Sequence, residues 1–251
     1  YILYGGTLAI CLICNLAVDR TLSWFWVVLT ALAVCASVTL VPVLAEKHRG
    51  LVTLGAFTAS LELLLLASCW FSGGGWFLLA TLAVLLGIGA VFLPFALGAL
   101  PVPLCRHRAA LCLGADCALL VLLLWEGCRY ANGDWFPLPA LPGVLLGMIL
   151  PWAWLGIIRY APLCRRWKGA ACLACAAALL PLVNPLLDRL VLLGGGEMER
   201  LHAFWFQADF TRWGDNWTSN ENTLLLVWIG LVCAAGVCAV LALAGRRKKR
   251  N

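Results

Sequence analysis

Residues 76–100 read WFLLATLAVLLGIGAVFLPFALGAL and carry no charged side chain over 25 positions. A helix rises about 1.5 Å per residue, so a run of this length crosses the roughly 30 Å hydrocarbon core of a bilayer. Membrane helices tolerate glycine and proline, such as Pro94, better than soluble helices do. The stretch therefore predicts a transmembrane helix.

Apolar runs of this kind recur along the whole chain. Hydrophobic residues make up 63% of the sequence and charged residues 12%, against about 25% charged residues in a soluble domain. The polar face that a soluble helix needs is missing. We therefore expect an all-α fold, a polytopic membrane helix bundle of about eight spans forming one domain over residues 1–251. The expected spans are residues 1–18, 24–45, 51–71, 76–100, 109–125, 138–158, 169–187 and 223–244.

Basic residues separate into two groups when the loops between these runs are taken alternately. Thirteen of the 18 lie in one set of loops and five in the other. Because lysine and arginine are retained on the cytoplasmic side, the larger set is predicted to be inside, together with both chain ends. The larger set comprises Lys47, Arg49, Arg106, Arg108, Arg159, Arg165, Arg166, Lys168, Arg246, Arg247, Lys248, Lys249 and Arg250.

The basic residues at the inner ends of the last two runs are expected to contact anionic lipid head groups, which attract cations at the cytoplasmic surface. The expected partners of the chain are therefore the bilayer and these head groups. The net charge of +6 is explained in this way and does not indicate direct contact with nucleic acid. The residues expected at the head groups are Arg165, Arg166, Lys168, Arg246, Arg247, Lys248, Lys249 and Arg250.

Short motifs recur at intervals of about 50–60 residues. Three runs open with Trp-Phe, and each later reaches an apolar residue followed by proline and then a basic loop. This pattern predicts tandem two-helix repeats that all have the same orientation. The openings are Trp24-Phe25, Trp76-Phe77 and Trp135-Phe136, and the prolines are Pro42, Pro94 and Pro151.

Two carboxylates fall inside apolar runs. Glu62 lies near the middle of the third run, and Asp116 lies inside the fifth. A carboxylate in the bilayer costs about 2.5–3.5 kcal/mol on insertion scales, so it is usually buried, paired, protonated or functional. Each is interpreted either as a proton or cation site or as a protonated or hydrogen-bonded packing residue.

Two polar pairs lie at the predicted outer ends of runs. Their members are spaced i,i+4 and therefore share one face of a helix. They could form a polar pocket at the outer surface, or they could hydrogen-bond at the helix ends with Arg20 and Arg189. The pairs are Asn15 with Asp19 and Asn184 with Asp188.

Residues 194–222 form the longest polar connection. The spacing of Leu201, Phe204 and Trp205 allows a short amphipathic helix on the outer leaflet, and the segment could instead cap a ligand cavity. The three histidines lie in expected loops, and neither they nor the 13 cysteines form a recognisable metal-ligand pattern. We expect no metal, no cofactor, no catalytic residue and no enzymatic activity.

Several of these motifs together resemble a known family. The Trp-Phe openings, the Leu-Gly-Ala starts at 54–56 and 113–115 and the Asn-Pro-Leu-Leu-Asp segment at 184–188 are similar to the multi-span tail of bacterial Cro/repressor-like helix-turn-helix regulators. Related membrane regions follow zinc-ribbon domains in other bacterial proteins. The resemblance covers nearly the whole chain but includes no DNA-binding domain. Because the first residue is Tyr1 and not Met, we expect an upstream cytoplasmic domain that is missing from this sequence.

The resemblance implies the membrane anchor or sensor domain of a membrane-tethered transcriptional regulator in the cytoplasmic membrane of a bacterium. A small-solute or ion transporter or channel that uses Glu62 and Asp116 is the alternative. A purely structural anchor is a third possibility, and it predicts that unrelated spans could replace this chain.

Overall fold

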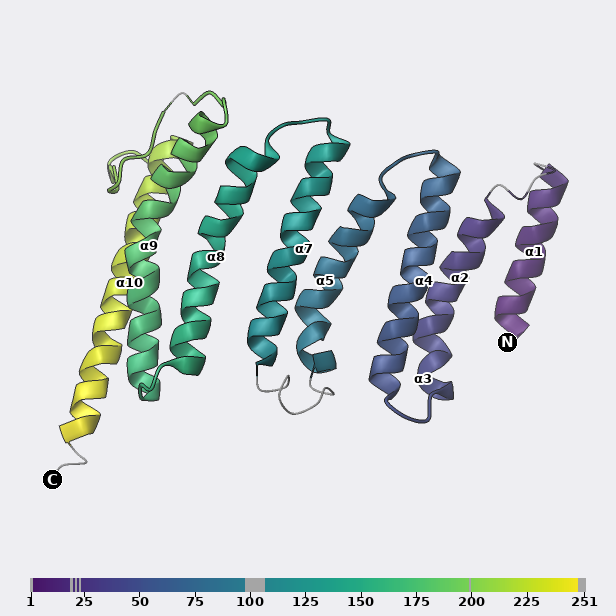
Figure 1. Ribbon diagram of the computed structural model, residues 1–251, viewed down its shortest axis with the longest axis horizontal. Helices are drawn as coiled ribbons and strands as arrows, with labels where there is room; N and C mark the ends of the chain where they lie inside the picture. Colours follow the sequence, from purple (N-terminus) through teal and green to yellow (C-terminus); the bar gives the residue numbers. More distant parts are fainter. Residues whose placement is uncertain are drawn as a thin grey trace. The chain divides into compact units, whose positions relative to one another are not determined.

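The computed structural model describes residues 2–18, 20, 22, 24–97, 107–198 and 200–247. Every regular element in these residues is helical, which confirms the all-α prediction (Figure 1). The elements are α1 (Ile2–Val18), α2 (Phe25–Thr39), α3 (Val41–Leu44), α4 (Arg49–Ser72), α5 (Phe77–Ala96), α7 (Arg108–Tyr130), the π-helical turn η2 (Phe136–Ala140), α8 (Leu141–Leu155), the π-helical turn η3 (Gly156–Tyr160), α9 (Arg165–Leu193) and α10 (Asn216–Arg247).

Six helical segments among the described residues are long and apolar enough to cross a membrane. Large apolar side chains on them are widely exposed, for example Phe95 at 76% and Val240 at 64%. Apolar surface on this scale is compatible with lipid and not with water. The chain is therefore a membrane protein with several spans. The six segments are α4, α5, α7, Phe136–Tyr160, α9 and Asn216–Ala244; the apolar helices Tyr4–Val18 and Phe25–Thr39 are shorter.

The eight predicted runs coincide with helices, but three boundaries differ in informative ways. The run 24–45 is divided between α2 and α3, because Pro42 lacks the N–H that would continue the hydrogen-bond ladder. Helix α9 continues past residue 187 and ends before Gly194, where a Cβ would lie 2.8 Å from the carbonyl oxygen of Leu138. Helix α10 begins at residue 216 and not at 223, so Glu221 and Asn222 are helical.

The three Trp-Phe pairs have the same local structure. Trp24, Trp76 and Trp135 each occupy the N-cap position, with φ between −96° and −78° and ψ between −6° and −2°. Two of the indoles cover the glycine two residues earlier, since a Cβ on Gly74 or Gly133 would lie 2.5 or 2.7 Å from the Cδ1 of the tryptophan. The sequence motif therefore corresponds to a repeated way of starting a helix.

The chain divides into two compact units. Unit one comprises Tyr1–Arg108 and Ala118–Ala131, and unit two comprises Ala109–Cys117 and Asn132–Asn251. In unit one, α1, α2, α4 and α5 run alternately up and down, and α2 against α4 is the most extensive contact (Figure 1). In unit two, α8, α9 and α10 alternate in the same way, and α9 packs most extensively against α10.

The pairing of α9 with α10 depends on small residues and on bonds from side chains to the backbone. Ala176 and Ala177 are buried on α9, and small residues let two helices approach closely in a membrane. The Trp228 indole donates to the carbonyl oxygen of Ala177 at 2.9 Å. Near the other end of the pair, Arg166 donates to the carbonyl oxygen of Leu241 at 2.8 Å. The two helices are thus joined by hydrogen bonds at two levels.

The predicted head-group contacts fall partly within the described residues. Arg165 and Arg166 are exposed, and Lys168 donates to the carbonyl oxygen of Ile158 at 2.6 Å. These bonds occupy only part of the donor capacity of Arg166 and Lys168, so their contact with lipid stays a prediction. The side chains of Arg246 and Arg247, together with Lys248, Lys249, Arg250 and Asp19, lie outside the described part of the chain.

Candidate functional site at the connection between α9 and α10

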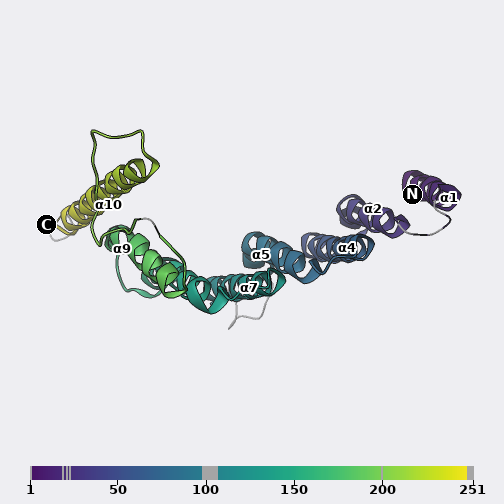
Figure 2. The ribbon, with the colours of Figure 1, turned by 90° about the horizontal axis from the view of Figure 1, so that it is seen from above.

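Residues 194–215 connect α9 to α10 and are called the capping segment below. The segment lies at one end of this helix pair, and Figure 2 shows it linking the two helices when they are seen from above. The part that the structure describes contains turns and bends but no helix, so the amphipathic helix that the spacing of Leu201, Phe204 and Trp205 allows is not formed there. Several of its backbone N–H groups are bound instead by side chains of α9 and α10.

Two buried carboxylates hold the capping segment by its backbone. Asp188 of α9 accepts a hydrogen bond from the backbone N–H of His202 at 2.6 Å. Glu221 of α10 accepts one from the backbone N–H of Gln207 at 2.9 Å. Side chains that bind backbone groups in this way compete with helix formation, which explains the irregular conformation.

Asn222 makes the third attachment and is fully buried. Its Oδ1 accepts from the backbone N–H of Asp209 at 2.7 Å, and its Nδ2 donates to the carbonyl oxygen of the same residue at 2.8 Å. Nδ2 also donates to the carbonyl oxygen of Arg212 at 3.2 Å. One amide therefore satisfies three backbone groups of the capping segment.

The imidazole of His202 lies between the two carboxylates. Its Nδ1 is 2.8 Å from Oδ2 of Asp188, and its Nε2 is 3.5 Å from Oε1 of Glu221, which is within ion-pair distance but outside hydrogen-bond geometry. Asp188 and Glu221 are each only 5% exposed. The ring stacks on Trp217 with the centroids 4.0 Å apart. A protonated imidazole would present one N–H to each carboxylate.

Aromatic packing adds to these attachments. Trp205 and Phe206 pack against Trp228 of α10, with ring centroids 5.2 and 6.0 Å away. The guanidinium of Arg189 lies 4.3 Å from the ring centroid of Phe204, a cation–π contact. The predicted alternative, in which Arg189 bonds to the neighbouring polar pair, is therefore replaced by a contact with the capping segment.

Two acids of the capping segment, the half-buried Asp209 and the exposed Asp215, are stabilised in their ionised form. The Thr211 hydroxyl donates to Asp209 at 2.6 Å and its backbone N–H at 3.0 Å, and these bonds lower the pKa of Asp209. The Thr218 hydroxyl donates to Asp215 at 3.1 Å and lowers its pKa, and Arg200 at 3.6 Å contributes in the same direction. Both carboxylates are therefore charged at neutral pH.

A shallow hollow of about 670 Å³ opens beside His202, with Arg200, Asp215 and Trp217 in its wall. Nε2 of His202 faces Glu221, and no serine, threonine or cysteine among the described residues donates to the ring. A nucleophile held by its base is the arrangement that covalent catalysis needs. The geometry instead favours a structural attachment, in which Asp188, Glu221, Asn222 and His202 hold the capping segment to α9 and α10; this group of four residues is called the clamp below. It lies next to a surface that a small polar ligand could reach.

The structure brings together only part of the predicted outer polar sites. Asp188 belongs to the clamp, whereas Asn184, one turn earlier on α9, is half-buried and makes no hydrogen bond with Asp188. Asn15 is fully buried in unit one. Sequence reasoning missed Glu221 and Asn222, although two polar residues directly before an apolar run could have indicated helix positions that face a partner.

The two intramembrane carboxylates belong to different units. Glu62 of α4 accepts a hydrogen bond from the Thr81 hydroxyl of α5 at 2.6 Å, and its other oxygen is buried without a hydrogen-bond partner. Asp116 of α7 also has one buried oxygen without a partner. Thr81 is therefore a polar partner that the sequence reasoning did not assign to Glu62.

Comparison with the profiles of known protein families, with curated proteins and with solved structures finds no match. The role of the clamp is therefore inferred from its geometry and charge. The similarity to the membrane tails of helix-turn-helix regulators stays a prediction.

Proposed function

We propose that this chain is the membrane anchor and sensor domain of a membrane-tethered bacterial transcriptional regulator. In this proposal α1 and the α2–α3 pair are also spans, which gives about eight crossings of the cytoplasmic membrane with both chain ends inside. The 17 residues of α1 and the combined length of α2 and α3 are within the range of roughly 17–25 residues for a span. The distribution of lysine and arginine supports this orientation.

The observation that carries the sensor proposal is the attachment of the capping segment to both α9 and α10. In the proposed orientation the segment faces outward, and the same two helices end at the basic cytoplasmic surface, where Arg166 bonds to Leu241. A ligand or envelope change that displaces the segment would alter the contacts of Asp188, Glu221 and Asn222 with it. The packed helix pair then provides a continuous physical connection to the inside.

We also propose that the domain is built from tandem two-helix repeats. The matching N-cap conformations of Trp24, Trp76 and Trp135 support this architecture. Such repeats have one orientation, so they differ from the inverted repeats of many transporters.

A chimera separates a sensor from a simple anchor. A DNA-binding reporter module is fused before Tyr1, and transcription from its promoter is compared between the wild type and His202→Ala at equal membrane levels. Thr223→Ala is the matched control, because Thr223 is exposed on α10, bonds only to Ser219 of the same helix and does not line the hollow beside His202. A change in reporter transcription in His202→Ala but not in the control supports a sensor. Unchanged transcription in both variants supports a simple membrane anchor. A natural reading frame upstream of Tyr1 that encodes no cytoplasmic module contradicts the regulator proposal.

Glu62 supports a second candidate function, a proton or cation transporter. Its unpartnered buried oxygen beside the Thr81 bond is the kind of site that binds a proton or a cation inside a membrane. Flux in liposomes that is lost in Glu62→Gln but kept in Glu46→Gln, where the carboxylate is exposed in a loop, supports this function. Flux that persists in Glu62→Gln removes Glu62 from the mechanism.

A further inference from the structure

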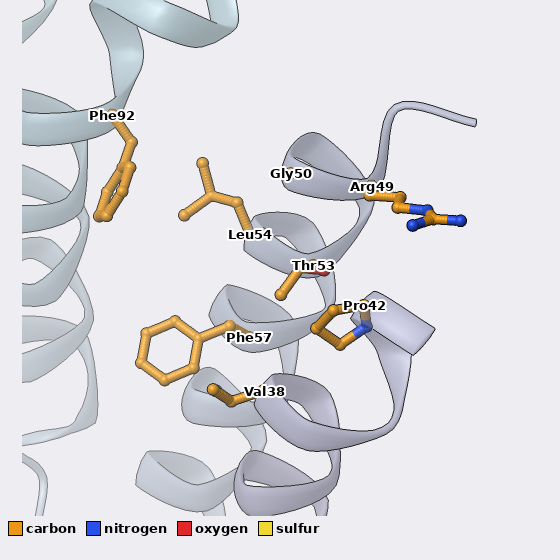
Figure 3. A pocket seen from close by; sticks show the side chains of 8 residues that line it. All are labelled: Val38, Pro42, Arg49, Gly50, Thr53, Leu54, Phe57 and Phe92. Atoms are coloured by element: carbon orange, nitrogen blue, oxygen red, sulfur yellow. The ribbon is translucent and has the colours of Figure 1, made fainter. Parts of the chain in front are cut away.

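An apolar groove of about 420 Å³ lies between α2, α3, α4 and α5 of unit one. Leu54 and Phe57 of α4 are directed toward Phe92 of α5, and Val38 and Pro42 complete the wall (Figure 3). The volume falls in the range of roughly 300–1,000 Å³ that is usual for small-molecule sites. Its lining would suit a hydrocarbon chain.

The groove exists partly because two positions leave it open. Pro42 divides α2 from α3, and Gly50 contributes no side chain to the wall. A Cβ built on Gly50 meets nothing within 4 Å, so the space next to it is empty of protein atoms. A larger side chain at this position would therefore enter the groove without displacing the backbone.

Arg49 gives the groove a positively charged rim. Arg49 lines the groove, and Figure 3 shows its guanidinium directed away from Leu54, Phe57 and Phe92, so the charge lies at the edge of the groove and not among its apolar side chains. Its Nε donates to the carbonyl oxygen of Ala45 at 2.9 Å, which fixes the group and leaves its other N–H donors available. Among the described residues, no acidic side chain forms an ion pair with Arg49.

We propose that this groove binds one anionic glycerophospholipid of the surrounding leaflet. An acyl chain fills the apolar part, and the phosphate lies at Arg49, whose planar group matches phosphate oxygens. Thr53, one turn further along α4, also lines the groove, and its buried hydroxyl is turned away from Leu54 and Phe57. This site does not depend on the regulator proposal, only on the placement of α4 and α5 in a bilayer.

Native mass spectrometry of the full chain, delipidated in mild detergent, tests the proposal with phosphatidylglycerol and with phosphatidylcholine of identical acyl chains. The wild type is expected to retain one phosphatidylglycerol and to prefer it over phosphatidylcholine. Gly50→Leu fills the groove and abolishes this retention. Gly55→Leu is the matched control, since Gly55 is also exposed on α4, also has nothing within 4 Å of a built Cβ, and does not line the groove.

Arg49→Gln tests the charged rim separately and changes only an exposed side chain. One cation near a membrane surface contributes an attraction that corresponds to about a fivefold preference, so this variant should lose about that much selectivity for phosphatidylglycerol. Retention in Gly50→Leu equal to the wild type overturns the proposal, as does an equal loss in Gly55→Leu. An unchanged preference in Arg49→Gln, or a neutral lipid as the retained species, overturns the assignment of an anionic ligand.

Discussion

Replacing Asn222 by alanine should release the capping segment while leaving the helices intact. The amide is fully buried and binds three backbone groups, which are the N–H and carbonyl of Asp209 and the carbonyl of Arg212. A hydrogen bond contributes about 1 kcal/mol net. Because Asp209 is half-buried and regains some contact with water, we expect a loss of about 2–3 kcal/mol and not more.

Amide hydrogen exchange in lipid nanodiscs measures this loss directly. A change of this size raises the open fraction of the segment roughly 30- to 150-fold, since about 1.4 kcal/mol corresponds to a factor of ten. The effect should appear at the amides of His202, Gln207 and Asp209, whose N–H groups are bound by the three anchoring side chains. Exchange in the centres of α9 and α10 should change little.

Asn220→Ala provides the reference for this experiment because Asn220 is exposed on the same helix and makes no hydrogen bond to the capping segment. If the two variants exchange at the same rate as the wild type at Asp209, the attachment by Asn222 does not contribute to stability. If Asn222→Ala accelerates exchange throughout α10, the residue supports the helix and not the segment. Either outcome refutes the clamp as described.

Two further predictions concern the helix pair and the carboxylate of Asp209. Trp228→Phe removes the indole N–H that donates to Ala177 while keeping an aromatic ring, so thermal unfolding in detergent should show a loss of stability of about 0.5–1.5 kcal/mol. Trp213→Phe is the control, because the indole of Trp213 donates to Phe210 within the capping segment, and it should lower the stability less. Equal losses in the two variants would contradict the role of Trp228. The hydrogen bonds from Thr211 lower the pKa of Asp209, so the ionised carboxylate stabilises the folded capping segment. This stabilisation is fully present above the ordinary pKa of 3.8 and is lost as the pH falls through the lower pKa of the folded state. The rate of amide hydrogen exchange at Asp209, corrected for its intrinsic rate, should therefore rise below about pH 4 in the wild type and rise less in Thr211→Ala. Identical pH profiles in the two proteins would exclude the bonds from Thr211 as the cause of the pH dependence.

The helices were predictable from the sequence because hydrocarbon thickness and composition constrain them strongly. Residues 76–100 are long and uncharged, and the structure places α5 within them. The clamp was harder to predict from the sequence, because Asp188, His202 and Glu221 are separated along the chain and meet only when an irregular segment folds back between two helices. The spacing that allowed an amphipathic helix there could not reveal that the anchoring side chains would bind the backbone instead.

Intramembrane polar residues show the same limit. The cost of burying a carboxylate identified Glu62 as a position that needs an explanation. Its partner Thr81 is one of several hydroxyl residues in apolar runs, and only the packing of α4 against α5 selects it. The sequence pattern identifies which helix carries a polar group, but it does not determine which neighbouring helix supplies the hydrogen-bond partner.

Proteolysis of oriented membrane vesicles tests most directly whether the chain spans a bilayer with the capping segment and the basic C-terminal end on opposite faces. Arg200 and Arg212 are exposed trypsin sites in the capping segment, and residues 246–250 are a cluster of basic sites at the other end of α10. In right-side-out vesicles we predict cleavage after Arg200 and Arg212 with the basic end protected, and in inside-out vesicles the reverse. Cleavage of both regions from the same face of sealed vesicles would contradict the account.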